Sequence, residues 1–188
     1  MKIELKVNID DNRMSDGLLA AMSTINQINE IPNTNFTLDF TNVGFVTPLY
    51  VLPLVVFLNS CDKEIKIVNN NDYLRTIGFP NGIHPDKMRN SEFLAVIERY
   101  SRKSYIPIIS FPTTKEGDDK KDAILSTIEL LIVKQLGMTP NVSTGLKYIL
   151  GETIDNIIQH AKSERGYIFA QSYPNKGYLD ICIADSGI

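Results

Sequence analysis

The stretch Gly151-Glu152-Thr153-Ile154-Asp155-Asn156-Ile157-Ile158-Gln159-His160-Ala161 combines a polar row with an apolar row. Residues four apart on a helix project from one face, so a helix here would place Glu152, Asn156 and His160 in a single row. The other side carries apolar residues at three- and four-residue steps: Leu146, Ile149, Leu150, Ile154, Ile157, Ile158 and Ala161. This spacing predicts an amphipathic helix that packs against a sheet.

The residues that follow predict an antiparallel hairpin over 166–184, with a Pro-Asn-Lys-Gly turn at 174–177. Apolar side chains alternate through its second strand at Leu179, Ile181 and Ile183. The same face continues to Asp185, so we expect this carboxylate on the buried side. A buried carboxylate needs a donor, such as a ligand amine or a water molecule. Gly187 would let the backbone come close to that ligand.

At these residues the chain resembles the GHKL (histidine-kinase-like) ATPase family, which includes gyrase and the sensor histidine kinases. It looks most similar to the anti-sigma-factor kinases, in which a helix carries Glu, then Asn four residues later, and often His four beyond that. The resemblance covers about residues 117–188. It implies a two-layer α/β sandwich, the Bergerat fold, that binds ATP with magnesium.

The resemblance also implies roles for individual residues. Asn156 would help to hold the magnesium ion bound to the nucleotide phosphates, and Glu152 would orient or activate water or the phosphoacceptor as the catalytic residue. Asp185 would accept a hydrogen bond from the adenine amino group, and Gly187 would shape the adenine pocket. The Asp-x-Gly-x-Gly box of the family is cut at Ile188. We therefore expect a truncated portion of the nucleotide site that has no turnover by itself.

The first eighty residues predict alternating strands and helices, which favours a sheet with helices packed on it. The expected strands are 3–7, 36–40 and 64–68, and the expected helices are 14–28, 48–58 and 72–77. The run from Thr37 to Pro48 resembles the core of STAS domains, the fold of anti-sigma-factor antagonists. In that family a strand ending in Asp leads to an acidic-Ser pair at a helix start. Thr47 stands there in this chain, and we interpret it as a helix cap and not as a phosphorylation site.

The chain as a whole is expected to be α/β (α+β) with three segments. These are a STAS-like domain at 1–85, a connector with a helix at 86–103, and a partial histidine-kinase-like ATP-binding domain at 104–188. Within the last two segments we expect a helix at 91–102, a strand at 105–111 and a polar loop at 113–119 that introduces another amphipathic helix.

Composition narrows the function classes. The net charge is −3 without a cluster of Lys and Arg, so we expect no nucleic-acid partner. The uncharged stretch 40–61 is long enough for a membrane span, but Pro and Asn residues interrupt it, and we expect a buried helix of a soluble protein. Cys61 and Cys182 each lie among apolar residues, which suits buried thiols in a reducing cytoplasm.

Two functions remain open from the sequence. The first is an ATP-binding, histidine-kinase-like regulatory protein of signal transduction, with protein kinase or ATPase activity in a longer chain. The alternative is a non-catalytic protein–protein interaction module of a signalling pathway. In the first case we expect a regulatory protein partner and a nucleotide. A homodimer is also expected, since an unpaired strand edge near Ile188 invites pairing between chains.

Overall fold

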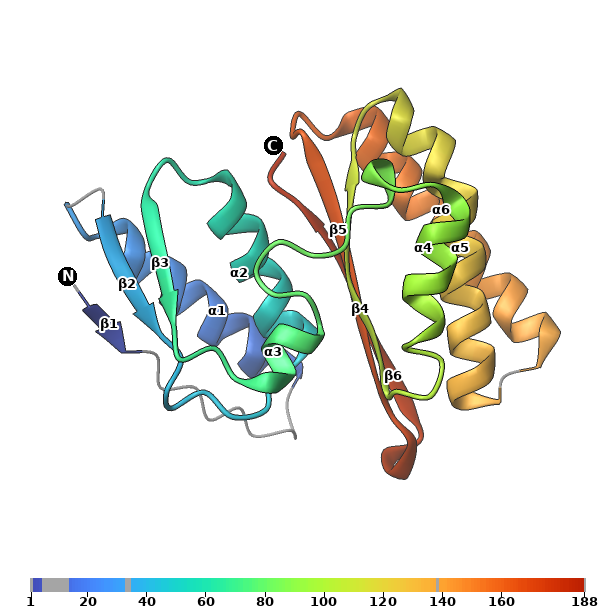
Figure 1. Cartoon of the computed structure of the whole chain (residues 1–188), viewed down its shortest axis with the longest axis horizontal. Helices are drawn as coiled ribbons and strands as arrows, with labels where there is room; N and C mark the ends of the chain where they lie inside the picture. Colours follow the sequence, from blue (N-terminus) through green and yellow to red (C-terminus); the bar gives the residue numbers. More distant parts are fainter. Residues whose placement is uncertain (1, 5–13, 33–34, 138, 188) are drawn as a thin grey trace. The chain divides into compact units, whose positions relative to one another are not determined.

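The computed structural model describes residues 2–4, 14–32, 35–137 and 139–187. The chain divides into two compact units, Met1–Asn81 and Gly82–Ile188. Both units combine helices with a small sheet, so the expected α/β class is correct at this level (Figure 1). The boundary falls four residues before the predicted one, and the segment 86–103, expected as a connector, belongs to the second unit.

The first unit contains a three-stranded parallel sheet in the order β1-β2-β3. Its strands are β1 (Lys2–Glu4), β2 (Asn35–Asp39) and β3 (Glu64–Val68), and its helices are α1 (Met14–Asn29), α2 (Pro48–Ser60) and α3 (Asp72–Thr76). Helices α1 and α2 pack against each other on the same side of the sheet (Figure 1). The predicted alternation of strands and helices is therefore present, although residues 5–7 of the first predicted strand lie outside the described residues.

Helix α2 lies within the uncharged stretch 40–61 and contributes to the core of the first unit. Pro48 occupies its first turn, where the missing N–H costs nothing, and seven of its residues are buried. Thr47 sits at the N-cap as expected, but its hydroxyl makes no capping hydrogen bond and packs against α1 at Gly17. None of the described helices is both long and apolar enough to cross a membrane.

The second unit is a three-stranded antiparallel sheet in the order β4-β5-β6. Its strands are β4 (Tyr105–Pro112), β5 (Arg165–Tyr173) and β6 (Tyr178–Asp185). Its helices are α4 (Asn90–Glu98), α5 (Lys115–Leu136) and α6 (Pro140–His160), with short 3-10 turns η1 (Pro85–Lys87) and η2 (Pro174–Lys176). The three α-helices cover one face of the sheet, and α5 lies beside α6 (Figure 1).

Two elements of the second unit differ from the prediction. Helix α5 begins at Lys115, inside the segment predicted as a polar loop. Residues 115–119 carry no apolar side chain in the sequence, so hydrophobic periodicity does not predict a helix there. Helix α4 ends at Glu98, four residues earlier than predicted, and buries Phe93 and Ile97 in the core between the helices and the sheet. The predicted connector therefore supplies part of the core.

The 3-10 turn η1 is tied to the sheet by Arg165 of β5. The guanidinium donates to the two carboxylate oxygens of Asp86 at 2.8 and 3.3 Å, and to the hydroxyl and carbonyl oxygens of Ser110 at 2.6 and 2.9 Å. Burial acts to raise the pKa of Asp86, but the hydrogen bond and the charge of Arg165 outweigh it and hold that pKa below its ordinary value. The ion pair therefore stabilises the folded state while Asp86 is ionised.

Replacing Asp86 tests this ion pair. Asp86→Asn should lower the free energy of unfolding by about 2 kcal/mol at pH 7, because it leaves a largely buried guanidinium without its anion. Since the folded-state pKa is lowered, the deficit should be constant above about pH 5 and shrink as the pH falls below about 3.9, the ordinary Asp value. Urea unfolding between pH 7 and pH 3 measures it. A deficit that grows on acidification would contradict this assignment.

Candidate functional site

Helix α6 presents the predicted polar row to solvent. The side chains of Glu152, Asn156 and His160 are all exposed. No hydrogen bond or ion pair joins the side chain of Glu152 or Asn156 to another described residue. Both groups are therefore free to bind a ligand. One predicted core residue is wrong, because Ile149 is 62% exposed beside this row.

Asp185, at the end of β6, lies on the side of the sheet that faces α6. Its direct cross-strand partner is Gly166, and direct partners on antiparallel strands point to the same face. A Cβ atom on Gly166 would lie 3.0 Å from Ile157 Cγ2 of α6 and 2.5 Å from the Phe111 ring. The predicted parity of Asp185 is therefore correct.

The environment of the Asp185 carboxylate differs from the prediction in one respect. The side chain is partly exposed and not buried, and its Oδ1 already accepts a hydrogen bond from the Gly187 N–H at 2.6 Å. The Asp-Ser-Gly turn thus supplies a donor itself, so burial alone does not demand a ligand. The turn holds the carboxylate in place and leaves Oδ2 for another donor.

Gly187 brings this turn against the C-terminal end of α6. A Cβ atom on Gly187 would lie 2.9 Å from the Lys162 nitrogen and 3.0 Å from Ala161 Cα. At 1.5 Å of rise per residue, Asn156 lies about 8 Å and Glu152 about 14 Å further along the helix from Ala161. The turn that carries Asp185 therefore lies at the C-terminal end of α6, and Asn156 and then Glu152 follow at increasing distance along the helix.

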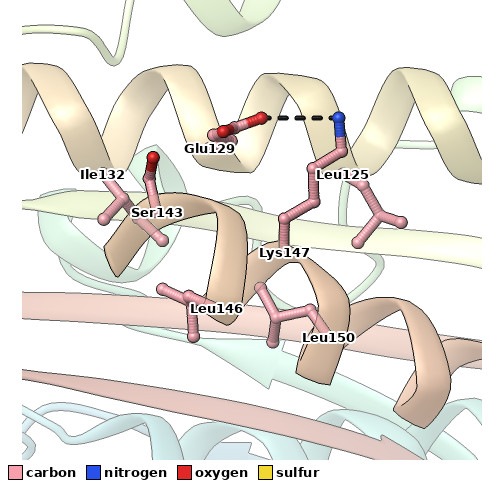
Figure 2. Close-up of a pocket in the computed structure, with 7 residues that line it drawn as sticks. All are labelled: Leu125, Glu129, Ile132, Ser143, Leu146, Lys147 and Leu150. Carbon is pink, nitrogen blue, oxygen red and sulfur yellow. Dashed lines mark ion pairs between the residues drawn. The ribbon is translucent and has the colours of Figure 1, made fainter. Parts of the chain in front are cut away.

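Two ion pairs that the sequence does not predict join α5 and α6. Lys121 binds Asp155 beside the polar row, and Lys147 Nζ lies 3.4 Å from Glu129 Oε2 nearer the start of α6. Figure 2 shows the second pair on the rim of an apolar hollow formed by both helices, and the hollow contains none of the predicted site residues. The partners are 34 and 18 residues apart in sequence, so no local spacing reveals them.

The cysteines and metal-binding side chains of the described residues add no second site. Burial, and then the neighbouring Asp180 carboxylate, raises the pKa of Cys182 to about 11, so its thiol stays protonated at neutral pH. The described residues contain no group of three or more His, Cys, Asp or Glu side chains that could hold a metal ion.

Comparison of the chain with protein-family models, with curated proteins and with solved structures finds no match.

The contact beneath Asp185 is tested by filling the space at Gly166. Gly166→Ala should lower the free energy of unfolding by about 2 kcal/mol, because the added methyl group would overlap the Phe111 ring and press on Ile157. Urea unfolding measures the change. Gly145→Ala on α6 is the control, since no atom lies within 4 Å of its Cβ position and the change should stabilise the helix by up to about 1 kcal/mol. An equally stable Gly166→Ala variant would contradict this packing.

Proposed function

We propose that the chain is an ATP-binding, histidine-kinase-like regulatory protein whose nucleotide site comprises Glu152, Asn156, Asp185 and Gly187. The observation that carries the proposal is the contact of the Asp-Ser-Gly turn with the end of α6. It places an oriented carboxylate at one end of a helix whose free polar row continues toward the other. The exposed amide and carboxylate of that row fit a magnesium-bound triphosphate, since both supply the oxygen atoms that magnesium and water require.

Each residue has one task in the proposed site. Asp185 Oδ2 accepts from the exocyclic amino group of adenine, while the Gly187 N–H holds Oδ1 and so fixes the plane of the carboxylate. The Asn156 side-chain oxygen supports the magnesium ion, and Glu152 accepts the proton of water or of a protein hydroxyl. Bound Mg-ATP supplies the phosphoryl group that is transferred. Which of the two acceptors is used decides between ATPase and protein kinase activity.

The first unit would regulate or recruit the second, as expected from its STAS-like order of elements. Asp39 at the end of β2 is buried and accepts hydrogen bonds from the Thr41 N–H at 2.9 Å, the Thr41 hydroxyl at 2.6 Å and the Asn69 side-chain amide at 2.8 Å. These contacts make it a structural residue. The Thr47 hydroxyl is packed against α1, which disfavours phosphorylation there. Regulation would then proceed through a protein partner, in the cytoplasm, where thiols such as Cys61 and Cys182 stay reduced.

One observation favours the alternative of a non-catalytic interaction module. Helix α1 exposes Leu18, Leu19 and Met22 on adjacent turns, and contiguous exposed apolar side chains are typical of protein-binding surfaces. A regulatory kinase also needs a protein partner, so this surface alone does not separate the two functions. Nucleotide binding separates them.

Titration of the chain with ATP tests the proposal. Calorimetry should detect saturable binding that is lost when EDTA removes magnesium. Asn156→Ala and Asp185→Asn should each weaken the affinity at least about tenfold, the equivalent of about 1.4 kcal/mol. Asn141→Ala is the matched control, because Asn141 is also exposed on α6 but lies a full four turns before Asn156.

The same substitutions also test which nucleobase the proposed site prefers. Asp185→Asn should weaken ATP more than GTP, because a carboxylate accepts from the adenine amino group and repels the guanine carbonyl oxygen. Absence of saturable ATP binding by the wild-type chain would overturn the proposal and favour the interaction module. Equal losses in the Asn156 and Asn141 variants would remove Asn156 from the site.

A further inference from the structure

The ion pair between Lys121 and Asp155 lies directly beside the proposed phosphate-binding row. Lys121 comes from the first half of α5, and Asp155 immediately precedes Asn156 on α6. The two side chains are 19% and 29% exposed, so the contact is largely shielded from water. The helices approach closely at this level, since a Cβ atom on Gly151 would lie 3.8 Å from Lys121 Cε and 3.5 Å from Leu125 Cδ1.

Helix geometry links this contact to the site. Successive residues of an α-helix are rotated by about 100°, so fixing the direction of Asp155 also fixes the directions of Asn156 and Glu152. The side chains of Glu152 and Asn156 make no hydrogen bond or ion pair with other described residues. Their direction toward a ligand therefore depends on the rotation of the helix itself.

The apolar contacts of α6 select the face that is buried. Leu150, Ile154 and Ile157 lie on that face, but the hydrophobic effect is non-directional and does not itself orient a polar side chain on the other face. A shielded ion pair with hydrogen-bond geometry is directional and adds such a constraint. The Lys121 ammonium is occupied by Asp155, which makes it a poor candidate for a phosphate ligand.

We propose that the Lys121–Asp155 ion pair is a positioning device that sets the rotation of α6 at which Glu152 and Asn156 face the nucleotide phosphates. This inference rests on the proposed function and adds to it a residue of α5, outside the polar row. It predicts that nucleotide affinity depends on a residue that never touches the nucleotide.

The chain contains a matched control for this role. Lys147 and Glu129 form a second ion pair between the same two helices, with side chains that are 35% and 28% exposed. Lys147 Nζ also lies 3.2 Å from the Ser126 hydroxyl. This pair lies eight residues before Asp155, about 12 Å along α6, and so has little influence on the direction of Asn156.

The test compares Lys121→Met with Lys147→Met in the full chain. Lys121→Met should weaken Mg-ATP binding about tenfold, the size expected when a residue that orients a metal ligand is lost. Lys147→Met should change the affinity less than about twofold, although it removes a similar ion pair. Lys121→Arg should retain most of the affinity, because a guanidinium also binds a carboxylate. If Lys121→Met reduces folding, the double variant Lys121→Asp with Asp155→Lys replaces it in the test. This exchange of charges keeps an ion pair and should restore the affinity for Mg-ATP.

A second measurement does not need the nucleotide. Hydrogen exchange of the backbone amides at 152–156 should be faster in Lys121→Met than in Lys147→Met, since only the first loses its contact at this level. Equal losses of affinity, or equal exchange at 152–156 in the two variants, would overturn the positioning role. A wild-type chain that fails to bind ATP would overturn the proposed function instead, while the exchange experiment would still decide whether Lys121 holds this turn of α6.

Discussion

The burial of one apolar row of α6 against the sheet determines the rest of the second unit. Leu150, Ile154 and Ile157 are all buried there, and each contributes about 2 kcal/mol relative to an exposed side chain. Turning the helix over would lose this stabilisation and bury Glu152 and Asn156 without partners, which costs still more. The polar row must therefore face outward. Within that limit, the Lys121–Asp155 contact adds the direction that non-directional apolar packing lacks.

In the first unit, too, apolar burial is combined with directional polar contacts, here around the carboxylate of Asp39. Phe36 and Leu38 of β2 are buried and anchor the strand, and the strand then ends in Asp39, whose carboxylate is buried as well. Three hydrogen bonds from Thr41 and Asn69 compensate this carboxylate. Asn69 reaches it from a backbone with φ of 54°, a conformation that Asn adopts more readily than most residues. Apolar burial therefore fixes the position of β2, and the hydrogen bonds then satisfy the carboxylate at its end.

Regular elements were predictable from the sequence because their signals are local. The strand at Glu64–Val68 has the predicted bounds, and the hairpin of β5 and β6 differs by one residue at each outer end. The start of α5 is not predictable in this way, because residues 115–119 are mostly charged and show no apolar periodicity. Helical spacing places Ile149 on the apolar face of α6, but the structure leaves its side chain exposed. The spacing indicates a broad apolar face and does not indicate how much of that face a neighbouring element covers.

Some features of the candidate site are likewise predictable from local spacing, and others depend on the tertiary structure. The row of Glu152 and Asn156 and the parity of Asp185 follow from spacing within one helix and one strand, so the sequence predicts them. The Asp185–Gly187 hydrogen bond and the closeness of this turn to Ala161 depend on how the hairpin returns to the helix. If the site binds ATP as we propose, its charges favour binding together with magnesium. Glu152 and Asp185 are anionic and Asp155 is neutralised by Lys121, so a bare triphosphate would be repelled by Glu152 at close range. In the proposed site, a divalent cation between the phosphates and the side chains of α6 would remove that repulsion and would let Glu152 act as a base beside an anionic substrate.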